Sequence, residues 1–198
     1  NVASATTPEE IIAGATIVSL EGPAEVLISD TAGFQLTAKV NQVSNLSVAN
    51  YTIAYDPALF EFVSASAGNI GGVSIPLAEG DWHDDGNGHL TVVQSLPDNT
   101  TASGSGNLAS FLFKVKATGL GTFAFTNGTL SDEEAYQLLS QWFGQEVRSL
   151  SLLSGDANAS GSVNSTDIVK VKRIILGLDS STEGADANHD GNINALDI

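Results

Sequence analysis

Residues 107–117, NLASFLFKVKA, alternate apolar and polar side chains along most of their length. The apolar positions are Ala109, Phe111, Phe113 and Val115, and the polar ones are Ser110, Lys114 and Lys116. A period of two places successive side chains on opposite faces of an extended chain. The stretch therefore predicts a β-strand with one buried face and one face in solvent.

The same alternation recurs on both sides of this stretch. FQLTAKV at 34–40, SVANYTIAY at 47–55 and GTFAFT at 121–126 each place apolar or aromatic residues on one face. Gly, Asn, Asp and Ser separate these short strands, and no alternating helices intervene. We therefore predict a mainly β fold, an antiparallel β-sandwich of the jelly-roll type, over residues 15–153. Residues 1–14 are predicted to be a linker.

Charge and composition limit the function. The chain has 198 residues, with 23 acidic against 7 basic side chains and a formal net charge of −16. Such a charge opposes binding to nucleic acid or to an anionic membrane and favours cations. There is no cysteine, which excludes thiolate metal sites, and no apolar run approaches the roughly 20 residues of a membrane helix.

Two segments depart from the strand pattern. SDEEAYQLLSQWFG at 131–144 begins with Ser131 three residues before Glu134 and ends at Gly144, which predicts a helix of two to three turns. The aromatic residues of this helix, Tyr136, Trp142 and Phe143, are expected to anchor it. The alternative is that they form a binding platform. A second helix is predicted to end near Gly177. Its apolar stripe is Ile168, Val171, Ile175 and Leu178.

An acidic loop occurs twice, from Asp156 to Asp167 and from Asp186 to Asp197. Calcium takes six to eight oxygen ligands, and this 12-residue spacing supplies them from alternate side chains, one backbone carbonyl and a final carboxylate. The predicted ligands of two calcium sites are Asp156, Asn158, Ser160, Ser162 and Asp167, and Asp186, Asn188, Asp190, Asn192 and Asp197. The alternative, a metal-free loop built from Asx turns, explains one copy more readily than two in register.

The two loops are not equivalent. The first has two carboxylates and the second has three, so charge alone predicts tighter calcium binding by the second. No helix follows the second loop before Ile198, and we expect the sequence to stop at a boundary inside this module.

Residues 155–198 resemble a type I dockerin, a small duplicated calcium module of bacterial cellulosomes and related secreted enzymes. The resemblance rests on GDANASGSVNSTDIVKVKRIILG and ADANHDGNINALDI, and on strand-like residues where an EF-hand would have an entering helix. It implies that Ser165, Thr166, Lys172 and Arg173 contact a partner. The alternative is that they are a helix start and a solvated basic face. In the second copy of the repeat, Ala195 and Leu196 stand at the positions that correspond to Ser165 and Thr166.

Residues 16–153 resemble a cohesin, the β-sandwich partner of dockerins. VSNLSVANYTIAYDPALFEFVSAS and GSGNLASFLFKVKATGLGTFAFTNGTLSD are the segments that carry this resemblance. It implies a flat partner-binding face that includes Val48, Asn50 and Thr52. Carbohydrate-binding modules share the sandwich fold, so the fold alone does not choose between a protein partner and a glycan.

A further cluster, EGDWHDDGNGHL at 79–90, surrounds Trp82 with acidic residues and histidines. An exposed indole can stack on a sugar ring, which makes Trp82 a candidate carbohydrate contact. The alternative is a solvated hairpin loop, with DDGNG as the turn. No arrangement of residues indicates a catalytic nucleophile or a general acid and base, so we predict that the chain is not an enzyme.

Together these features predict a non-catalytic, calcium-binding protein–protein assembly region of a secreted bacterial protein, extracellular or on the cell surface, that acts on polysaccharide. Its expected partners are cohesin or dockerin modules of other chains and, as a further candidate, polysaccharide. The alternatives are a carbohydrate-binding module or a structural spacer of a secreted glycoside hydrolase.

Overall fold

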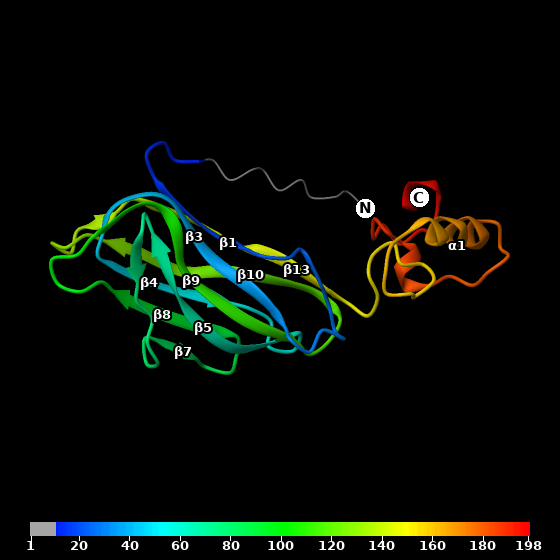
Figure 1. Cartoon of the computed structure of the whole chain (residues 1–198), viewed down its shortest axis with the longest axis horizontal. Helices are drawn as coiled ribbons and strands as arrows, with labels where there is room; N and C mark the ends of the chain where they lie inside the picture. Colours follow the sequence, from blue (N-terminus) through cyan, green and yellow to red (C-terminus); the bar gives the residue numbers. More distant parts are fainter. Residues whose placement is uncertain (1–10) are drawn as a thin grey trace.

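The computed structural model describes residues 11–198 and consists of a β-sandwich followed by a small module with one α-helix (Figure 1). This confirms the predicted mainly β fold. Residues 1–10 of the predicted linker lie outside the described residues. The last strand of the sandwich ends at Leu150 and the first residue of the acidic loops is Asp156. The division at residues 15–153 and 155–198 stays a prediction.

One sheet has six strands in the order β12-β1-β3-β9-β5-β6. Their bounds are Ser140–Phe143 for β12, Thr16–Glu21 for β1, Phe34–Leu46 for β3, Ala102–Val115 for β9, Phe60–Ile70 for β5 and Val73–Ile75 for β6. All neighbours are antiparallel except β1 and β12, which run parallel.

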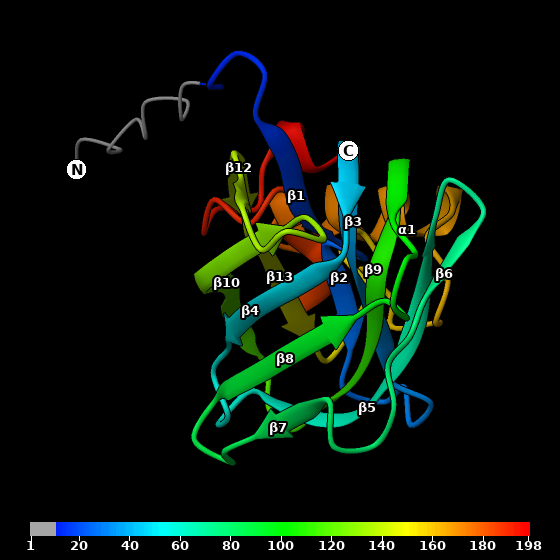
Figure 2. The same ribbon diagram turned by 90° about the vertical axis from the view of Figure 1, so that its left-hand side faces the viewer.

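The second sheet has the order β2-β13-β10-β4-β8-β7, with β11 paired to β10. The bounds are Glu25–Leu27 for β2, Gln145–Leu150 for β13, Gly119–Ser131 for β10, Val48–Ala54 for β4, His89–Ser95 for β8, Trp82–Asp84 for β7 and Gln137–Leu138 for β11. β2 is an edge strand and pairs parallel to β13. Figure 2 shows β8, β4 and β10 passing in front of the strands of the first sheet.

The core lies between the two sheets, as the alternation predicts. Ala109, Phe111 and Phe113 of β9 are buried, whereas Val115, at the end of the strand, is half-buried. The ring of Phe113 contacts four other aromatic rings, with centroids 4.9–6.0 Å away. These neighbours are Phe34, Tyr55, Phe62 and Phe123. Burial of such rings is the main stabilising contribution to a sandwich of this kind.

The helix predicted at 131–144 is wrong. Asp132 instead starts a tight turn, in which its Oδ1 accepts the Tyr136 N–H at 2.7 Å, and β11 and β12 follow. Trp142 packs against Tyr51 and Phe125, with ring centroids 5.6 and 4.9 Å away, while β12 pairs with β1. A capping box contributes about 1 kcal/mol, and a helix this short is marginal. Strand pairing and burial of the indole outweigh those local signals.

The C-terminal module contains α1, Ser165–Ile175, and short 3₁₀ helices at Glu183–Ala185 and Ala195–Asp197. The predicted end near Gly177 is confirmed, because Gly177 adopts φ +70° and its N–H bonds to the Ile174 carbonyl. The predicted stripe is only partly correct. Val171 is buried and Ile174 packs beside it, whereas Ile168, Ile175 and Leu178 are exposed. The helix packs on the two loops through one narrow side.

The module lies beyond the end of the sandwich at which β13 finishes (Figure 1). Within residues 11–198 no helix has the length and apolar character needed to cross a membrane.

Candidate functional site

The first acidic loop is folded around two buried carboxylates. Asp156 accepts the backbone N–H groups of Ser160 and Gly161, at 2.9 and 2.6 Å, and Asp167 accepts those of Asn158 and Asn164, at 3.1 and 2.9 Å. The exposed fractions of Asp156 and Asp167 are only 1 and 2 %. These bonds hold positions 1 and 12 of the loop close together before any ion is considered.

The second loop repeats this pattern position by position. Asp186 accepts from Asp190 and Gly191, at 3.1 and 2.9 Å, and Asp197 accepts from Asn188 and Asn194, at 3.3 and 2.8 Å. Asp197 is 8 % exposed. The sequence repeat therefore corresponds to a structural repeat, even though the second loop is followed by a 3₁₀ turn instead of an α-helix.

The oxygen atoms of these loops match the chemistry of calcium. The side chains of Asp156 and Asp167 are hydrogen-bonded to each other. Neither forms an ion pair with a basic side chain in residues 11–198. A buried carboxylate without a counter-charge is costly, so a cation is the partner that this arrangement lacks. In the same residues no three His, Cys, Asp or Glu side chains are grouped as a metal site. The remaining ligands would have to be amide, hydroxyl and backbone oxygens.

The ionisation of Asp167 agrees with this chemistry. Burial, the largest single influence, would raise the pKa of Asp167. The N–H groups of Asn164 and Asn158, together with a hydrogen bond to the Asp156 side chain, outweigh burial, so the pKa lies below its ordinary value.

The four predicted partner contacts on α1 differ in whether they already bond to other residues of the chain. Ser165 and Thr166 are exposed at the start of α1, although Thr166 is also tied to the loop, because its Oγ1 accepts from Asn158 Nδ2 at 2.7 Å. Lys172 is exposed and forms no ion pair in the described chain. Arg173, in contrast, makes two bonds of 3.0 Å to Asp179.

Asp179 is a residue that the sequence reasoning missed. It receives Lys170 Nζ as well as Arg173, both at 3.0 Å, and so ties the end of α1 to the following loop. Basic side chains in the last turn are a usual feature of helices, and nothing in the local sequence indicated a carboxylate partner beyond Gly177. Arg173 therefore has a structural contact in addition to its predicted contact with a partner.

The hydrogen bonds from Arg173 and, to a smaller extent, from Lys170 lower the pKa of Asp179 to about 2. Because the folded-state pKa is below the ordinary value, the ion pair stabilises the fold above about pH 4 and is lost as the pH falls through 2. A carbon-detected NMR titration is expected to place the Asp179 carboxyl near 2 in the full chain. Arg173→Gln should move it toward the ordinary value. A midpoint near 4 in the unmodified chain would contradict the ion pair.

On the sandwich, Val48, Asn50 and Thr52 lie on the outward face of β4. Neighbouring strands extend this face, since Ser95, Val93 and Thr91 of β8 and Ser131, Thr129 and Asn127 of β10 lie opposite these residues in register. We call these nine residues the recognition face. None of them is charged. Asn50 is at the centre of this face, and Val93, beside Asn50 on β8, is an apolar side chain that is 47 % exposed.

The loop around Trp82 is a hairpin, as the alternative interpretation predicted, because β7 and β8 pair across it. Asp85 accepts the N–H groups of Asn87 and His89 at 2.8 and 3.0 Å and so closes the turn. Trp82 is half-buried against Phe62, with ring centroids 5.1 Å apart. Its role as a glycan contact stays a prediction, and part of the indole surface is already occupied.

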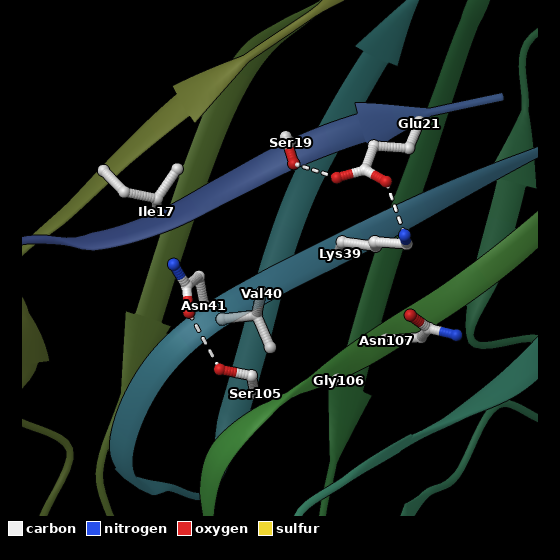
Figure 3. Close-up of a pocket in the computed structure, with 9 residues that line it drawn as sticks. All are labelled: Ile17, Ser19, Glu21, Lys39, Val40, Asn41, Ser105, Gly106 and Asn107. Atoms are coloured by element: carbon white, nitrogen blue, oxygen red, sulfur yellow. Dashed lines mark hydrogen bonds and ion pairs between the residues drawn. The ribbon is translucent and has the colours of Figure 1, made fainter.

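An open pocket of ≈ 630 Å³ lies on the other sheet, across β1, β3 and β9 (Figure 3). Glu21 and Lys39 form an ion pair of 2.5 Å in it, and Ser105 donates to Asn41 at 2.9 Å. The charged groups of the pocket neutralise each other, and no aromatic residue lines it. We assign it no ligand.

Two domain families match the chain. The cohesin domain family matches residues 29–139, which is more than half of the chain, and the dockerin type I domain family matches residues 154–198. No curated protein matches the chain by sequence.

Solved structures resemble the sandwich. A non-cellulosomal cohesin from the hyperthermophilic archaeon Archaeoglobus fulgidus is 18 % identical, with 69 % of this chain and 91 % of that chain covered and a TM-score of 0.56. The sixth cohesin of scaffoldin B from Acetivibrio cellulolyticus, solved with a dockerin, is also 18 % identical, covers 69 % and 99 %, and has a TM-score of 0.57. A type I cohesin–dockerin complex from Clostridium thermocellum is 13 % identical, with 69 % of this chain and 99 % of that chain covered and a TM-score of 0.57. At these identities the likeness shows the fold.

Proposed function

Because the chain belongs to the cohesin family and carries a dockerin type I module after its sandwich, we propose that it is a non-catalytic adaptor with two binding ends. The sandwich would bind a dockerin of another chain, and the C-terminal module would bind a cohesin of another chain. The observation that carries this proposal is the presence of both halves of one recognition pair in a single polypeptide.

Two calcium ions would be bound by the C-terminal module. In the first loop the ligands are the five predicted residues from Asp156 to Asp167, and in the second the five from Asp186 to Asp197. Buried Asp156 and Asp167 support the first site and buried Asp197 the second, and the repeated hydrogen bonds support both. Bound calcium would supply the positive charge that these buried carboxylates lack and would fix the start of α1, where Ser165 and Thr166 lie.

The recognition face is the part of the sandwich that we propose for the incoming dockerin. It is uncharged and has exposed apolar surface at Val93, and such a surface favours a partner whose central contacts are aliphatic or hydroxyl groups. Two acidic residues that border the recognition face already bond within the sandwich. Asp81, whose carbonyl accepts the Val93 N–H at 2.8 Å, accepts the Ala78 N–H with its side chain, and Asp132, which follows Ser131, accepts the Tyr136 N–H.

The two binding ends of one chain do not meet each other in this structure. The C-terminal module lies beyond the end of β13, whereas the recognition face is formed by β10, β4 and β8 (Figure 1). Only residues 151–155 separate Leu150 from Asp156, and five residues cannot carry the module round to that face. Contacts made by either end would therefore be contacts between chains.

The binding experiment has one arm for each end. Purified dockerins, each tested against the full chain by calorimetry, probe the sandwich. Val93→Asp should lower the affinity about 100-fold or more, because it places a charge in a desolvated apolar contact. The matched control is Val63→Asp, at a residue that is 40 % exposed on β5 of the other sheet. Equal binding by the chain and by both variants would place the binding surface elsewhere.

Purified cohesins probe the C-terminal module in calcium. Lys172→Glu should weaken binding about tenfold if this exposed lysine meets the partner. Lys114→Glu, at an exposed lysine of β9, is the matched control. Absence of binding by the unmodified chain to every member of a broad cohesin panel would overturn this half of the proposal.

The setting proposed for this adaptor is a secreted, polysaccharide-degrading assembly of a bacterium. Cohesin–dockerin pairs are typical of secreted cellulosome proteins, and this supports the extracellular location. The strongly acidic composition is compatible with a role that depends on calcium and not on nucleic acid.

A further inference from the structure

A small network of hydrogen bonds joins the second acidic loop to the sandwich. Glu25 Oε1 accepts from Ser154 Oγ at 2.8 Å and lies 3.0 Å from His189 Nε2, which is itself 2.7 Å from Ser154 Oγ. Because the serine hydroxyl donates to the carboxylate, Nε2–H of the histidine is the donor that satisfies the other two contacts. Glu25 belongs to the sandwich, Ser154 to the connecting segment 151–155, and His189 to the second loop.

The position of Glu25 makes it available to the module. It lies on β2, the edge strand next to β13, and the chain leaves the sandwich at Leu150 directly beside β2. The connecting segment is also held from the other side, since Ser151 donates to Glu183 and the Gly155 N–H bonds to the Gly184 carbonyl at 2.8 Å. The module is therefore fastened at two points near this edge.

His189 distinguishes the second loop from the first. It stands at position 4 of its loop with φ +57°, and Ala159 stands at position 4 of the first loop with φ +58°. The backbone is the same, but alanine has no group that can reach the sandwich. The His189 side chain is only 20 % exposed, and that of Glu25 is 37 % exposed. The contact is thus specific to one of the two loops and partly shielded from water.

We infer that the Glu25 edge of the sandwich is a docking surface for the second acidic loop of the same chain, and that docking and calcium binding in this loop strengthen each other. The inference rests on the proposed calcium site. Without calcium, docking brings Glu25 close to a loop that already holds Asp186, Asp190 and Asp197, and like charges repel. Bound calcium reverses the sign of that interaction. By reciprocity, the docked glutamate raises the calcium affinity of the second loop.

The two loops can be observed separately through their glycines at position 6. The Gly161 N–H bonds to Asp156 Oδ2 and the Gly191 N–H bonds to Asp186 Oδ2, so each amide signal reports the state of its own loop. A calcium titration of the full chain at low salt, followed by amide NMR, is the experiment. Glu25→Gln keeps an oxygen acceptor but removes the charge, and His189→Ala copies the first loop.

Both variants should raise the calcium concentration at the Gly191 midpoint about fivefold and leave the Gly161 midpoint unchanged. Residual dipolar couplings should show one fixed orientation of the module in the calcium-loaded chain and averaged orientations in both variants. Glu61→Gln, at an exposed glutamate of β5, is the matched control and should change neither readout.

Two failures can be told apart. A Gly191 midpoint that stays the same in both variants, while calcium still binds, would overturn the docking inference and leave the calcium sites intact. No response of either glycine to calcium in the unmodified chain would overturn the proposed sites and the inference together.

Discussion

Chelation of calcium is expected to unfold residues 154–198 while the sandwich stays folded. The fully buried apolar residues of the C-terminal module are only Ala157, Val171 and Ala185, too few to stabilise it alone. Its carboxylates Asp156 and Asp167 are buried together without a basic partner, so removal of the cation leaves them repelling each other. Calcium at about 1,000 times its dissociation constant would contribute about 4 kcal/mol to the folded module.

Amide NMR of the full chain measures this directly. In EDTA the signals of 154–198 should collapse to unfolded positions, and those of the strands from Thr16 to Leu150 should persist, with changes confined to residues near β2 and β13. Asp167→Ala in calcium should reproduce the effect on the module, whereas Asp98→Ala, in a loop of the sandwich, should not. A fully folded module in EDTA would show that calcium is not what holds it.

Phe113→Ala is expected to destabilise the sandwich by about 3–5 kcal/mol. The side chain is completely buried, and its ring contacts Phe34, Tyr55, Phe62 and Phe123. Truncation therefore loses both the burial of the ring and a set of aromatic contacts made by both sheets. Urea unfolding, followed by tryptophan fluorescence, should show a lower midpoint with an unchanged slope.

Whether the loss of stability in Phe113→Ala is confined to the sandwich is a second test. The calcium affinity of the C-terminal module should be unchanged in Phe113→Ala under conditions where the sandwich remains folded, because the two cores share no residue. Val93→Ala, at an exposed apolar position, is the matched control and should cost less than about 0.5 kcal/mol. A loss of comparable size in the control would show that Phe113 is not at the centre of the core.

Local patterns were sufficient for much of the fold and for the loops. The alternation at 34–40 and 47–55, and that from Ala109 to Lys114, places buried and exposed faces correctly, because the face of a side chain in a regular strand depends on its position along the chain. The acidic loops are equally local, since the bonds that shape each one join residues at most nine apart. Their calcium ligands stay predictions.

Long-range packing explains the failures. The segment 131–144 carries helix signals in its own residues, but its state depends on β1 and on Tyr51 and Phe125, which are distant in sequence. The stripe of α1 was assigned too widely for a similar reason: Val171 and Ile174 pack on the loops, whereas Ile175 is 44 % exposed.

The residues alone indicate a sandwich, a duplicated acidic loop and one helix, because each of these depends on periodicity or spacing within a short segment. Tertiary structure decided three further points: that Arg173 bonds to Asp179, that Trp82 packs on Phe62, and that Glu25 meets His189. The last of these joins residues 164 positions apart. A contact over that separation forms only after the sheets have placed β2 beside the exit of the last strand, and no local pattern encodes it.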